Sequence, residues 1–203
     1  MPKFDVKKEL KHLYQPSAKE FSVVDVPEMN FLMIDGRGDP NTSREYQEAM
    51  EALYAVAYQL KFAVKGRDPR LDFVVAPLEG LWWAEDMSDF LSGNKDAWLW
   101  TAMIYQPEQV TQELFQEAVQ QVKEKKDPIA LPLLRLEPYH EGLAVQILYF
   151  GPWAGEGPAI KRLHAFARDQ GYQIRGKHHE IYLSDPRRIA PEKLRTVIRQ
   201  PVE

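Results

Sequence analysis

A carboxylate flanked by a histidine and a phenol lies in the segment HHEIYLSDP, residues 178–186. Its Ile-Tyr-Leu run favours a β-strand, and the Ser-Asp-Pro that follows favours a turn. Because successive strand side chains point to opposite faces, His178, Glu180 and Tyr182 share one face. We expect the other face, which carries the Ile and the Leu, to pack on helices. Glu180 and Tyr182 would then face a groove that a ligand can enter.

The carboxylate of Glu180 has two interpretations. It is either a surface group, on a solvent-exposed sheet face or paired with Arg187 or Arg188, or a partly buried group in an apolar cleft. In a cleft, loss of water raises the pKa of a glutamate above its reference value of about 4.3, which makes it a general base or acid near neutral pH. The same carboxylate can also pair with a cationic ligand and do no chemistry.

A second carboxylate, Glu79, lies in the apolar run PLEGLWW. It either ends a strand in solvent or points inward. If it points inward, two carboxylates share the cleft, and their mutual repulsion raises one pKa and leaves one acid and one base. Tyr182, Tyr149 and Tyr105 are alternative proton donors.

Tryptophans are concentrated on two predicted strands. Trp82 and Trp83 lie on one and Trp98 and Trp100 on the next. Such a cluster usually belongs to a core, but four tryptophans exceed what one small core needs, and an aromatic wall can stack on a flat ligand or attract a cation. Alternation puts Trp82 and Trp83 on opposite faces, so without a bulge only one of them faces the cleft. Trp153, in a later turn, could close the end of the cleft.

Other motifs fit known chemistry poorly. His178, His179 and Glu180 do not form a metal cluster, since the neighbouring histidines point to opposite faces and the His-Glu-x-x-His spacing is missing. GRGDP lacks the glycines and the Lys-Ser/Thr of a phosphate loop, and Ser184 lacks a Gly-x-Ser-x-Gly elbow. We therefore expect no metal and no cofactor.

The composition is that of a folded protein without a nucleic-acid partner. The 203 residues are 44% hydrophobic and 11% aromatic, carry a net charge of −4 and include no cysteine. This balance gives no basic face for nucleic acid or an anionic membrane. The start, MPKFDVKKEL, lacks the apolar run of a signal peptide, and no stretch approaches the ~20 apolar residues of a membrane-spanning helix. We expect a soluble cytoplasmic protein whose partner is a small molecule, with monomer and homodimer both left open.

The predicted elements repeat along the chain. After a polar lead-in over 1–28, the pattern predicts strands at 30–35, 71–83, 96–106, 131–138, 142–150, 177–183 and 194–202, and helices at 43–65, 107–126 and 158–170. The order strand-helix-strand-strand therefore occurs twice. This predicts an α+β fold forming one domain, 1–203, with pseudo-twofold halves at about 29–106 and 131–203, a linking helix at about 107–126 and a central ligand cleft.

Three segments carry a resemblance to a known family. VDVPEMNFLMIDGRGDPN, APLEGLWW and, most specifically, HHEIYLSDPRRIAPEKLRTVIRQPV resemble the stand-alone branch of the GyrI-like small-molecule-binding family. The resemblance runs from about Phe4 to Val202. It implies a tandem strand-helix-strand-strand fold, related to the effector-binding domains of multidrug-responsive transcription regulators. It also implies a cleft for bulky, often aromatic or cationic molecules.

The resemblance implies specific roles. Some stand-alone members are implied to hydrolyse cyclopropane-bearing, DNA-alkylating natural products, with a glutamate that matches Glu180. Opening such a ring beside a carbonyl needs a base for water and a proton donor. The alternatives are a non-catalytic drug-sequestering or effector-sensing protein, or a gyrase-modulating one. The predicted catalytic residues are Glu180 and Tyr182, and the predicted ligand-binding residues are Glu79, Trp82, Trp83, Trp98, Trp100, Tyr105, Tyr149, Trp153 and His178.

Overall fold

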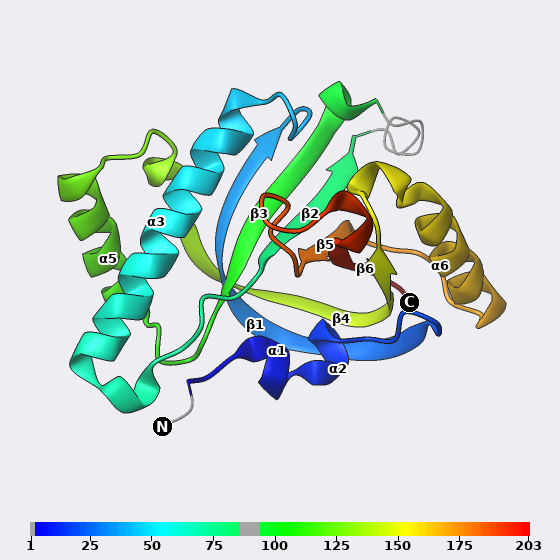
Figure 1. The fold of residues 1–203 in the computed structure, drawn as a ribbon, viewed down its shortest axis with the longest axis horizontal. Coiled ribbons are helices and arrows are strands. Elements are labelled where there is room, and N and C mark those ends of the chain that lie inside the picture. The colour runs from blue at the N-terminus through cyan, green and yellow to red at the C-terminus, as the bar shows by residue number, and fades with distance from the viewer. Residues whose placement is uncertain (1–2, 86–93) are drawn as a thin grey trace. The chain divides into compact units, whose positions relative to one another are not determined.

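The computed structural model describes residues 3–85 and 94–203 (Figure 1). The helices are α1 (Val6–Glu9), α2 (Lys11–Tyr14), α3 (Arg44–Arg67), α5 (Gln112–Lys125) and α6 (Gly157–Asp169). The strands are β1 (Ser22–Arg37), β2 (Leu78–Ala84), β3 (Trp98–Gln106), β4 (Arg135–Phe150), β5 (His178–Tyr182) and β6 (Arg195–Pro201). None of the helices in the described ranges is long and apolar enough to cross a membrane.

The predicted α+β class is confirmed. Along the chain β1, α3, β2 and β3 are followed by α5 and then by β4, α6, β5 and β6. The strands are hydrogen-bonded in the order β1-β3-β2-β5-β6-β4. The pairs β1–β3, β4–β6 and β5–β6 are antiparallel. The pseudo-twofold relation between the two halves stays a prediction.

The observed elements differ from the predicted ones in three places. The expected strands 131–138 and 142–150 form the single strand β4, with Leu131–Leu133 as a separate 3₁₀ turn before it. Gly142 lies inside β4 with φ at +71°. In the sequence, a glycine between two strand-like segments indicates a turn, so two separate strands were predicted. The polar lead-in 1–28, for which no element was predicted, contains α1, α2 and the start of β1. The first of the two middle strands is also shorter than expected, since β2 begins only at Leu78.

The chain divides into two compact units. Unit 1 comprises Met1–Val6, Met29–Ala76 and Trp82–Tyr139, and unit 2 comprises Lys7–Glu28, Pro77–Leu81 and His140–Glu203.

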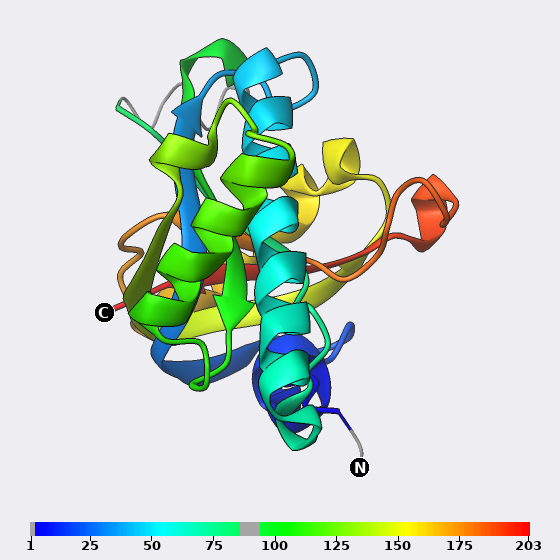
Figure 2. The same ribbon diagram turned by 90° about the vertical axis from the view of Figure 1, so that its left-hand side faces the viewer.

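Unit 1 is built on the pair β1–β3 and on two helices that pack together. The strands pair from Asn30 opposite Gln106 to Arg37 opposite Leu99. Ser43 begins α3, because its side chain accepts a hydrogen bond from the Tyr46 backbone N–H at 3.2 Å. Figure 2 shows α5 beside α3. The residues that α3 buries are Ala49, Ala52, Leu53, Val56, Ala57, Leu60 and Val64.

The tryptophans of unit 1 pack around one tyrosine of α3. The rings of Trp100 and Tyr46 meet edge to face with centroids 5.0 Å apart, and Trp82 lies 6.1 Å from the same tyrosine. Trp82 also meets Trp98 edge to face at 5.8 Å. Trp100 is fully buried, and its strand partner is Gly36, over which its ring lies.

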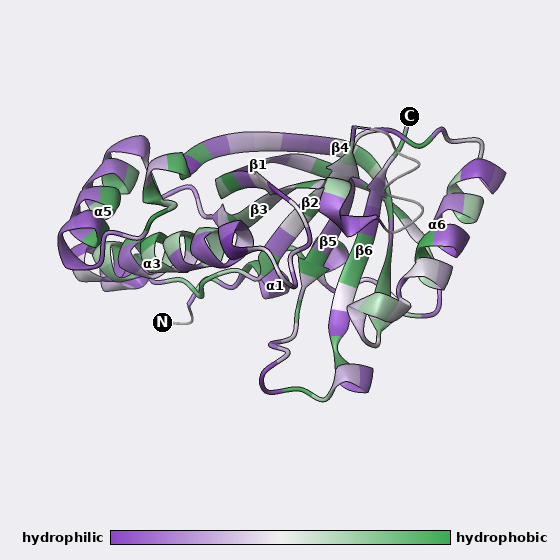
Figure 3. Ribbon diagram, turned by 90° about the horizontal axis from the view of Figure 1, so that it is seen from above, coloured by the Kyte–Doolittle hydropathy of each residue, from purple (hydrophilic) through white to green (hydrophobic). Residues whose placement is uncertain are grey.

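Unit 2 is built on the strands β4, β6 and β5 and on α6. The register pairs His179 with Arg199 and Glu180 with Ile198, so Glu180 and Ile198 share a face. Ile198 belongs to the core that α6 completes with Ala159, Leu163 and Ala167. Figure 3 shows hydrophobic and hydrophilic residues interspersed along α6, as expected for a helix with one buried side.

This register corrects the expected faces of β5. We expected the Ile181 face to pack on helices and the Glu180 face to be open, but α6 packs on the face that carries Glu180. Both faces of β5 are buried at their histidines, His178 and His179. The alternation of residues along the strand therefore could not show which face packs on a helix.

Gly36 gives a test of this packing. A Cβ built on Gly36 would clash with the Trp100 ring and lie 2.6 Å from a Glu45 carboxylate oxygen. We expect Gly36→Ala to lower the free energy of unfolding by about 1–3 kcal/mol through overpacking. The control is Gly66→Ala in α3, where a Cβ meets nothing within 4 Å. It should raise stability by about 0.5–1 kcal/mol. Equal denaturant midpoints for the two variants would contradict the packing.

Candidate functional site

The candidate site is centred on Glu180 in β5. The Tyr182 hydroxyl donates a hydrogen bond to Glu180 Oε2 at 2.8 Å, and His178 Nε2 lies 3.3 Å from Glu180 Oε1. The Glu180 side chain is 15% exposed, whereas His178 is buried. The three residues predicted to share a strand face therefore do contact one another.

Two aromatic side chains lie at the turn before α6, and one of them meets the Tyr182 ring. The Trp153 ring meets the Tyr182 ring edge to face with centroids 5.5 Å apart and is 40% exposed. The Tyr149 hydroxyl donates to the Pro152 carbonyl at 3.3 Å. A Cβ on Gly151 or Gly155 would lie 2.5 or 2.7 Å from the Tyr149 hydroxyl oxygen, so both glycines let the turn fold against this tyrosine.

Glu156 is a functional candidate that the sequence analysis missed. It directly precedes α6 in the turn GPWAGEG, is only 2% exposed, and its side chain makes no cap hydrogen bond to the helix. Burial, and then the charge of Glu180, raise the pKa of Glu156 to about 9. Glu156 therefore holds its proton at neutral pH.

Glu180 behaves in the opposite way. Burial would raise its pKa, but His178 and the hydrogen bonds with Tyr182 and Glu156 outweigh burial and lower the pKa below its usual value. The expectation of a raised pKa at Glu180 is therefore wrong, and the raised value belongs to Glu156. Burial, and then the charge of Glu156, also raise the pKa of Tyr149. At neutral pH the site thus contains one ionised and one protonated carboxyl group.

The second carboxylate expected beside Glu180 was Glu79, which lies elsewhere in unit 2. Glu79 is buried, and it accepts a hydrogen bond from the Tyr14 hydroxyl at 2.7 Å and contacts His179 Nε2 at 3.0 Å. Alternation places His179 on the opposite face of β5 from Glu180. Both Glu79 oxygens are engaged, so we assign Glu79 to a buried polar network and not to the carboxyl pair.

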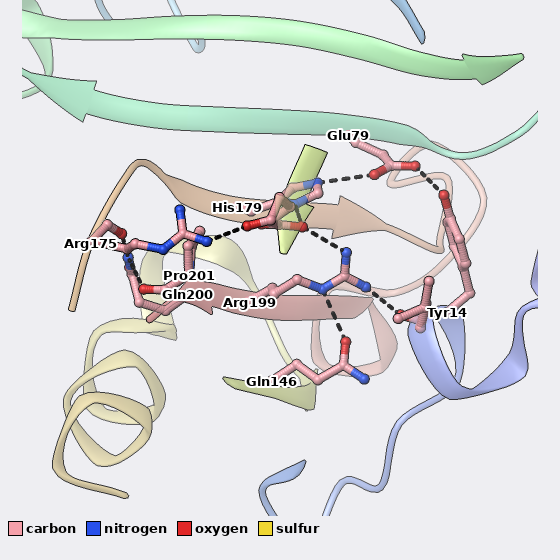
Figure 4. A network of polar contacts seen from close by, with 10 residues as sticks. Tyr14, Glu79, Gln146, Arg175, His179, Arg199, Gln200 and Pro201 are labelled. Atoms are coloured by element: carbon pink, nitrogen blue, oxygen red, sulfur yellow. Dashed lines mark hydrogen bonds and ion pairs between the residues drawn. The ribbon is translucent and has the colours of Figure 1, made fainter. Parts of the chain in front are cut away.

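This network continues through charged side chains on β4 and β6 (Figure 4). His179 Nδ1 lies 2.9 and 3.0 Å from the two oxygens of Glu141, and Arg199 Nη1 donates to Glu141 at 3.1 Å. Arg199 also donates to Gln146 Oε1 at 3.0 Å and to the Leu13 carbonyl at 2.6 Å. Two acidic and two basic side chains are thus buried together.

The network fixes the protonation of its members. Burial would raise the pKa of Glu141, but the charges of His179 and Arg199 lower it to about 2. Burial would lower the pKa of His179, but Glu141 and Glu79 raise it to about 9. His179 is therefore a cation at neutral pH, with both ring nitrogens donating to carboxylates. The described residues contain no group of three or more His, Asp or Glu side chains that could hold a metal ion.

The remaining predicted ligand-binding residues belong to unit 1. Trp82 and Trp100 are buried under Tyr46, while Trp83 and Trp98 are half-buried. Lys95 Nζ lies 5.5 Å from the centre of the Trp98 ring. Tyr105 packs on Phe4 and Phe31. A ligand-binding role for these five side chains stays a prediction.

The model of the GyrI-like small molecule binding domain matches residues 19–203. An uncharacterized conserved protein from Listeria innocua is 42% identical with a TM-score of 0.90, over 99% of this chain and 100% of that chain. A hydrolase from Listeria innocua is 40% identical with a TM-score of 0.86, again over 99% and 100%. The C-terminal domain of EcmrR, at 12% identity and a TM-score of 0.56 over 91% and 97%, shares the fold. Curated proteins gave no significant match.

The buried network predicts a large cost for removing one charge. Glu141→Gln leaves Arg199 and His179 buried with less compensation, and we expect a loss of about 3–5 kcal/mol in the free energy of unfolding. The control is Glu137→Gln on the same strand, which breaks an ion pair with Arg135 in which the Glu137 side chain is 54% exposed. It should cost less than about 1 kcal/mol. Similar denaturant midpoints for the two variants would contradict a stabilising network.

The protonated Glu156 predicts a pH dependence of stability. Its pKa is about 9 in the folded chain and near 4.5 when unfolded, so its contribution is fully present below pH 4.5 and is lost as pH rises toward 9. Glu156→Gln cannot ionise, and its free energy of unfolding should fall less steeply over this range, by about 1 kcal/mol per pH unit. The slope of stability against pH is best measured between pH 5 and 6. His179 is protonated there in both the folded and the unfolded chain, so it adds little to the slope.

The control for this measurement is Glu192→Gln, an exposed glutamate in the 3₁₀ turn Pro191–Lys193. It should follow the wild-type slope. If Glu156→Gln also follows the wild-type slope, Glu156 does not hold a proton in the folded protein.

Proposed function

Because the chain belongs to the GyrI-like family of small-molecule-binding domains, we propose that it binds bulky aromatic or cationic molecules beside Glu180 and hydrolyses cyclopropane-bearing genotoxic natural products there. The observation that carries the proposal is the carboxyl pair, with Glu180 ionised and Glu156 protonated at neutral pH. The 40% identity to a protein described as a hydrolase supports the enzymatic part.

The side chains around the pair suit such a ligand. The Trp153 ring is 40% exposed, and it contacts the Tyr182 ring edge to face. A flat ring can stack on the indole, and a positive charge is attracted both by the ring and by the Glu180 carboxylate. Glu156 stays neutral beside Glu180, so the site presents one negative charge and not two.

We propose the following steps for opening of the cyclopropane ring by Glu180 and Tyr182. Glu180 takes a proton from water as the water oxygen attacks a cyclopropane carbon, and the ring C–C bond breaks. Its electron pair moves to the conjugated carbonyl, whose oxygen takes the Tyr182 proton. Glu180 then returns its proton to the Tyr182 oxygen, 2.8 Å away. One water is added overall, and both side chains are regenerated.

Tyr182 also adjusts the strength of the base. A carboxylate with a lowered pKa is a weak base, and the hydrogen bond from Tyr182 is one of the contacts that lower it. When the Tyr182 hydroxyl turns to a substrate carbonyl, Glu180 loses that contact and becomes more basic. Ligand binding would therefore activate the base at the moment it is needed.

The second candidate function is non-catalytic binding, as an effector sensor or drug-sequestering protein. The same observation supports it, because an ionised Glu180 next to Trp153 recognises a cation whether or not water attacks. The roles of Trp82, Trp83, Trp98, Trp100 and Tyr105 in ligand contact, and the pseudo-twofold repeat of the fold, belong to the proposal as well. Superposing residues 30–106 on 142–202 tests the repeat.

Replacing Glu180 separates the two functions. Glu180→Gln keeps the shape and removes the charge, so a hydrolase should lose about 10²–10⁴ in rate on a cyclopropane-bearing alkylator, with affinity little changed. A binder should instead lose about one to two decades in affinity for a flat aromatic cation such as ethidium. Ring-opened product measures the first, and quenching of tryptophan fluorescence the second.

Two further variants make the test sharper. Tyr182→Phe keeps the ring that meets Trp153 and should lower turnover more than affinity. The exposed Glu192→Gln should leave both at wild-type levels. If Glu180→Gln also leaves both unchanged, the proposed site is wrong.

A further inference from the structure

Thr196 on β6 has a hydroxyl group that is buried and makes no hydrogen bond within the described residues. Along β6 it lies opposite Tyr149 of β4 on one side and opposite Tyr182 of β5 on the other. Residues directly opposite each other on neighbouring strands point to the same face of the sheet. The hydroxyl group therefore lies on the face that carries Glu180, between two tyrosines of the candidate site.

The two tyrosines do not supply the missing partner. The Tyr149 hydroxyl donates to the Pro152 carbonyl at 3.3 Å, and the Tyr182 hydroxyl donates to Glu180 Oε2 at 2.8 Å. Burial of an unpaired hydroxyl group is unfavourable, so in folded proteins such groups are almost always paired with the protein or with an ordered water. The Thr196 hydroxyl group therefore indicates that a small polar molecule binds next to it.

Glu156 has a second unpaired atom beside the first. Its Oε1 is buried and also makes no hydrogen bond within the part of the chain that the structure describes. Thr196 is among the groups that affect the pKa of Glu156, so the two side chains are neighbours although the hydroxyl group makes no direct hydrogen bond. Two polar groups that are close together without a direct contact are typical of a pair bridged by a water molecule.

Glu180 is the third group around this position. It lies two residues from Tyr182, the strand partner of Thr196, so Glu180 and Thr196 are diagonal neighbours with Cβ atoms about 7 Å apart. This separation leaves room for one water between the hydroxyl and the carboxylate. We propose that Thr196, Glu156 and Glu180 together bind one water molecule, and that this is the water that attacks the substrate in the proposed hydrolysis.

Three hydrogen bonds, the usual number for a buried water, hold the molecule in this position. The water accepts one from the Thr196 hydroxyl, and it donates one to Glu156 Oε1 and one to the Glu180 carboxylate. Its second lone pair stays free to attack a cyclopropane carbon. As that C–O bond forms, Glu180 takes the proton that it already accepts, and the hydrogen directed at Glu156 remains on the product hydroxyl. The role in the reaction rests on the proposed function, whereas the binding of the water does not.

Thr196→Val tests whether the water is bound, because valine keeps the shape of the side chain and removes the hydroxyl group. If a water pairs with the hydroxyl, the equilibrium constant of unfolding should rise by about two- to tenfold. Thr101→Val on β3 is the matched control, since the buried Thr101 donates to Asp35 Oδ1 at 2.7 Å, and it should also destabilise the chain. A Thr196→Val variant that is more stable than wild type would overturn the proposal, because removing an unpaired buried hydroxyl group is favourable.

Magnetic relaxation dispersion of water ¹⁷O counts the long-lived waters inside the protein directly. Wild type and Thr196→Ser, which keeps the hydroxyl group, should each contain one such water more than Thr196→Val. Equal counts in the three proteins would also overturn the proposal, even if Thr196→Val is destabilised.

Turnover of a cyclopropane-bearing alkylator separates this inference from the proposed function. Misplacing the attacking water in Thr196→Val should lower kcat by about 10²-fold with KM little changed, and Thr196→Ser should restore kcat to within about threefold of wild type. A water that is lost in Thr196→Val without a fall in kcat would overturn its role in the reaction. A wild type without turnover would overturn the proposed hydrolysis, and the water count would still decide whether Thr196 holds a water.

Discussion

Unit 2 depends on the ion pair between Glu141 and Arg199 and on the side chains that complete it. A buried charge without a partner costs several kcal/mol, so each member is tolerated only because the others are in place. The contacts join segments far apart in sequence, since Arg199 binds the carbonyl of Leu13 and His179 binds Glu79. The network therefore fixes where α2 and the start of β2 meet β4, β5 and β6.

The same network determines the geometry of the candidate site. His179 must face Glu141, so alternation along β5 places His178, Glu180 and Tyr182 on the other face. A slip of β5 by one residue would exchange the faces and bury Glu180 among the network's groups. The two faces differ in how their buried charges are compensated. One face compensates every buried charge, whereas the other keeps a carboxyl pair that shares one proton, which is where function is expected.

The sequence predicted what depends on local pattern. The alternation in HHEIY was enough to group His178, Glu180 and Tyr182, and helical spacing located α3 and α6 to within a few residues. Short elements were missed for a physical reason. Helices of four residues, such as α1 and α2, have no periodicity, and Gly142 with positive φ inside β4 cannot be distinguished from a turn.

Properties that depend on tertiary packing could not be predicted. Glu156 is the acidic residue of a Gly/Pro turn, and nothing in GPWAGEG indicates that folding buries it beside Glu180. For the same reason, the predicted direction of the Glu180 pKa shift was wrong. Burial alone would raise the pKa of Glu180, but the contacts that lower it come partly from Glu156, which is distant in the sequence.

On each face of β5, one side chain that keeps its proton at neutral pH stabilises the buried groups around it. On one face His179 keeps its proton up to about pH 9 because two carboxylates surround it. On the other face Glu156 keeps its proton to about the same pH because it is buried and because Glu180 is ionised. Loss of either proton leaves like charges facing each other in a buried environment. Since both losses fall in one alkaline range, the structural network and the carboxyl pair should fail together there. Below that range, Glu141 stays ionised down to about pH 2. The arrangement that fixes β5 therefore holds over the neutral range in which the carboxyl pair can work.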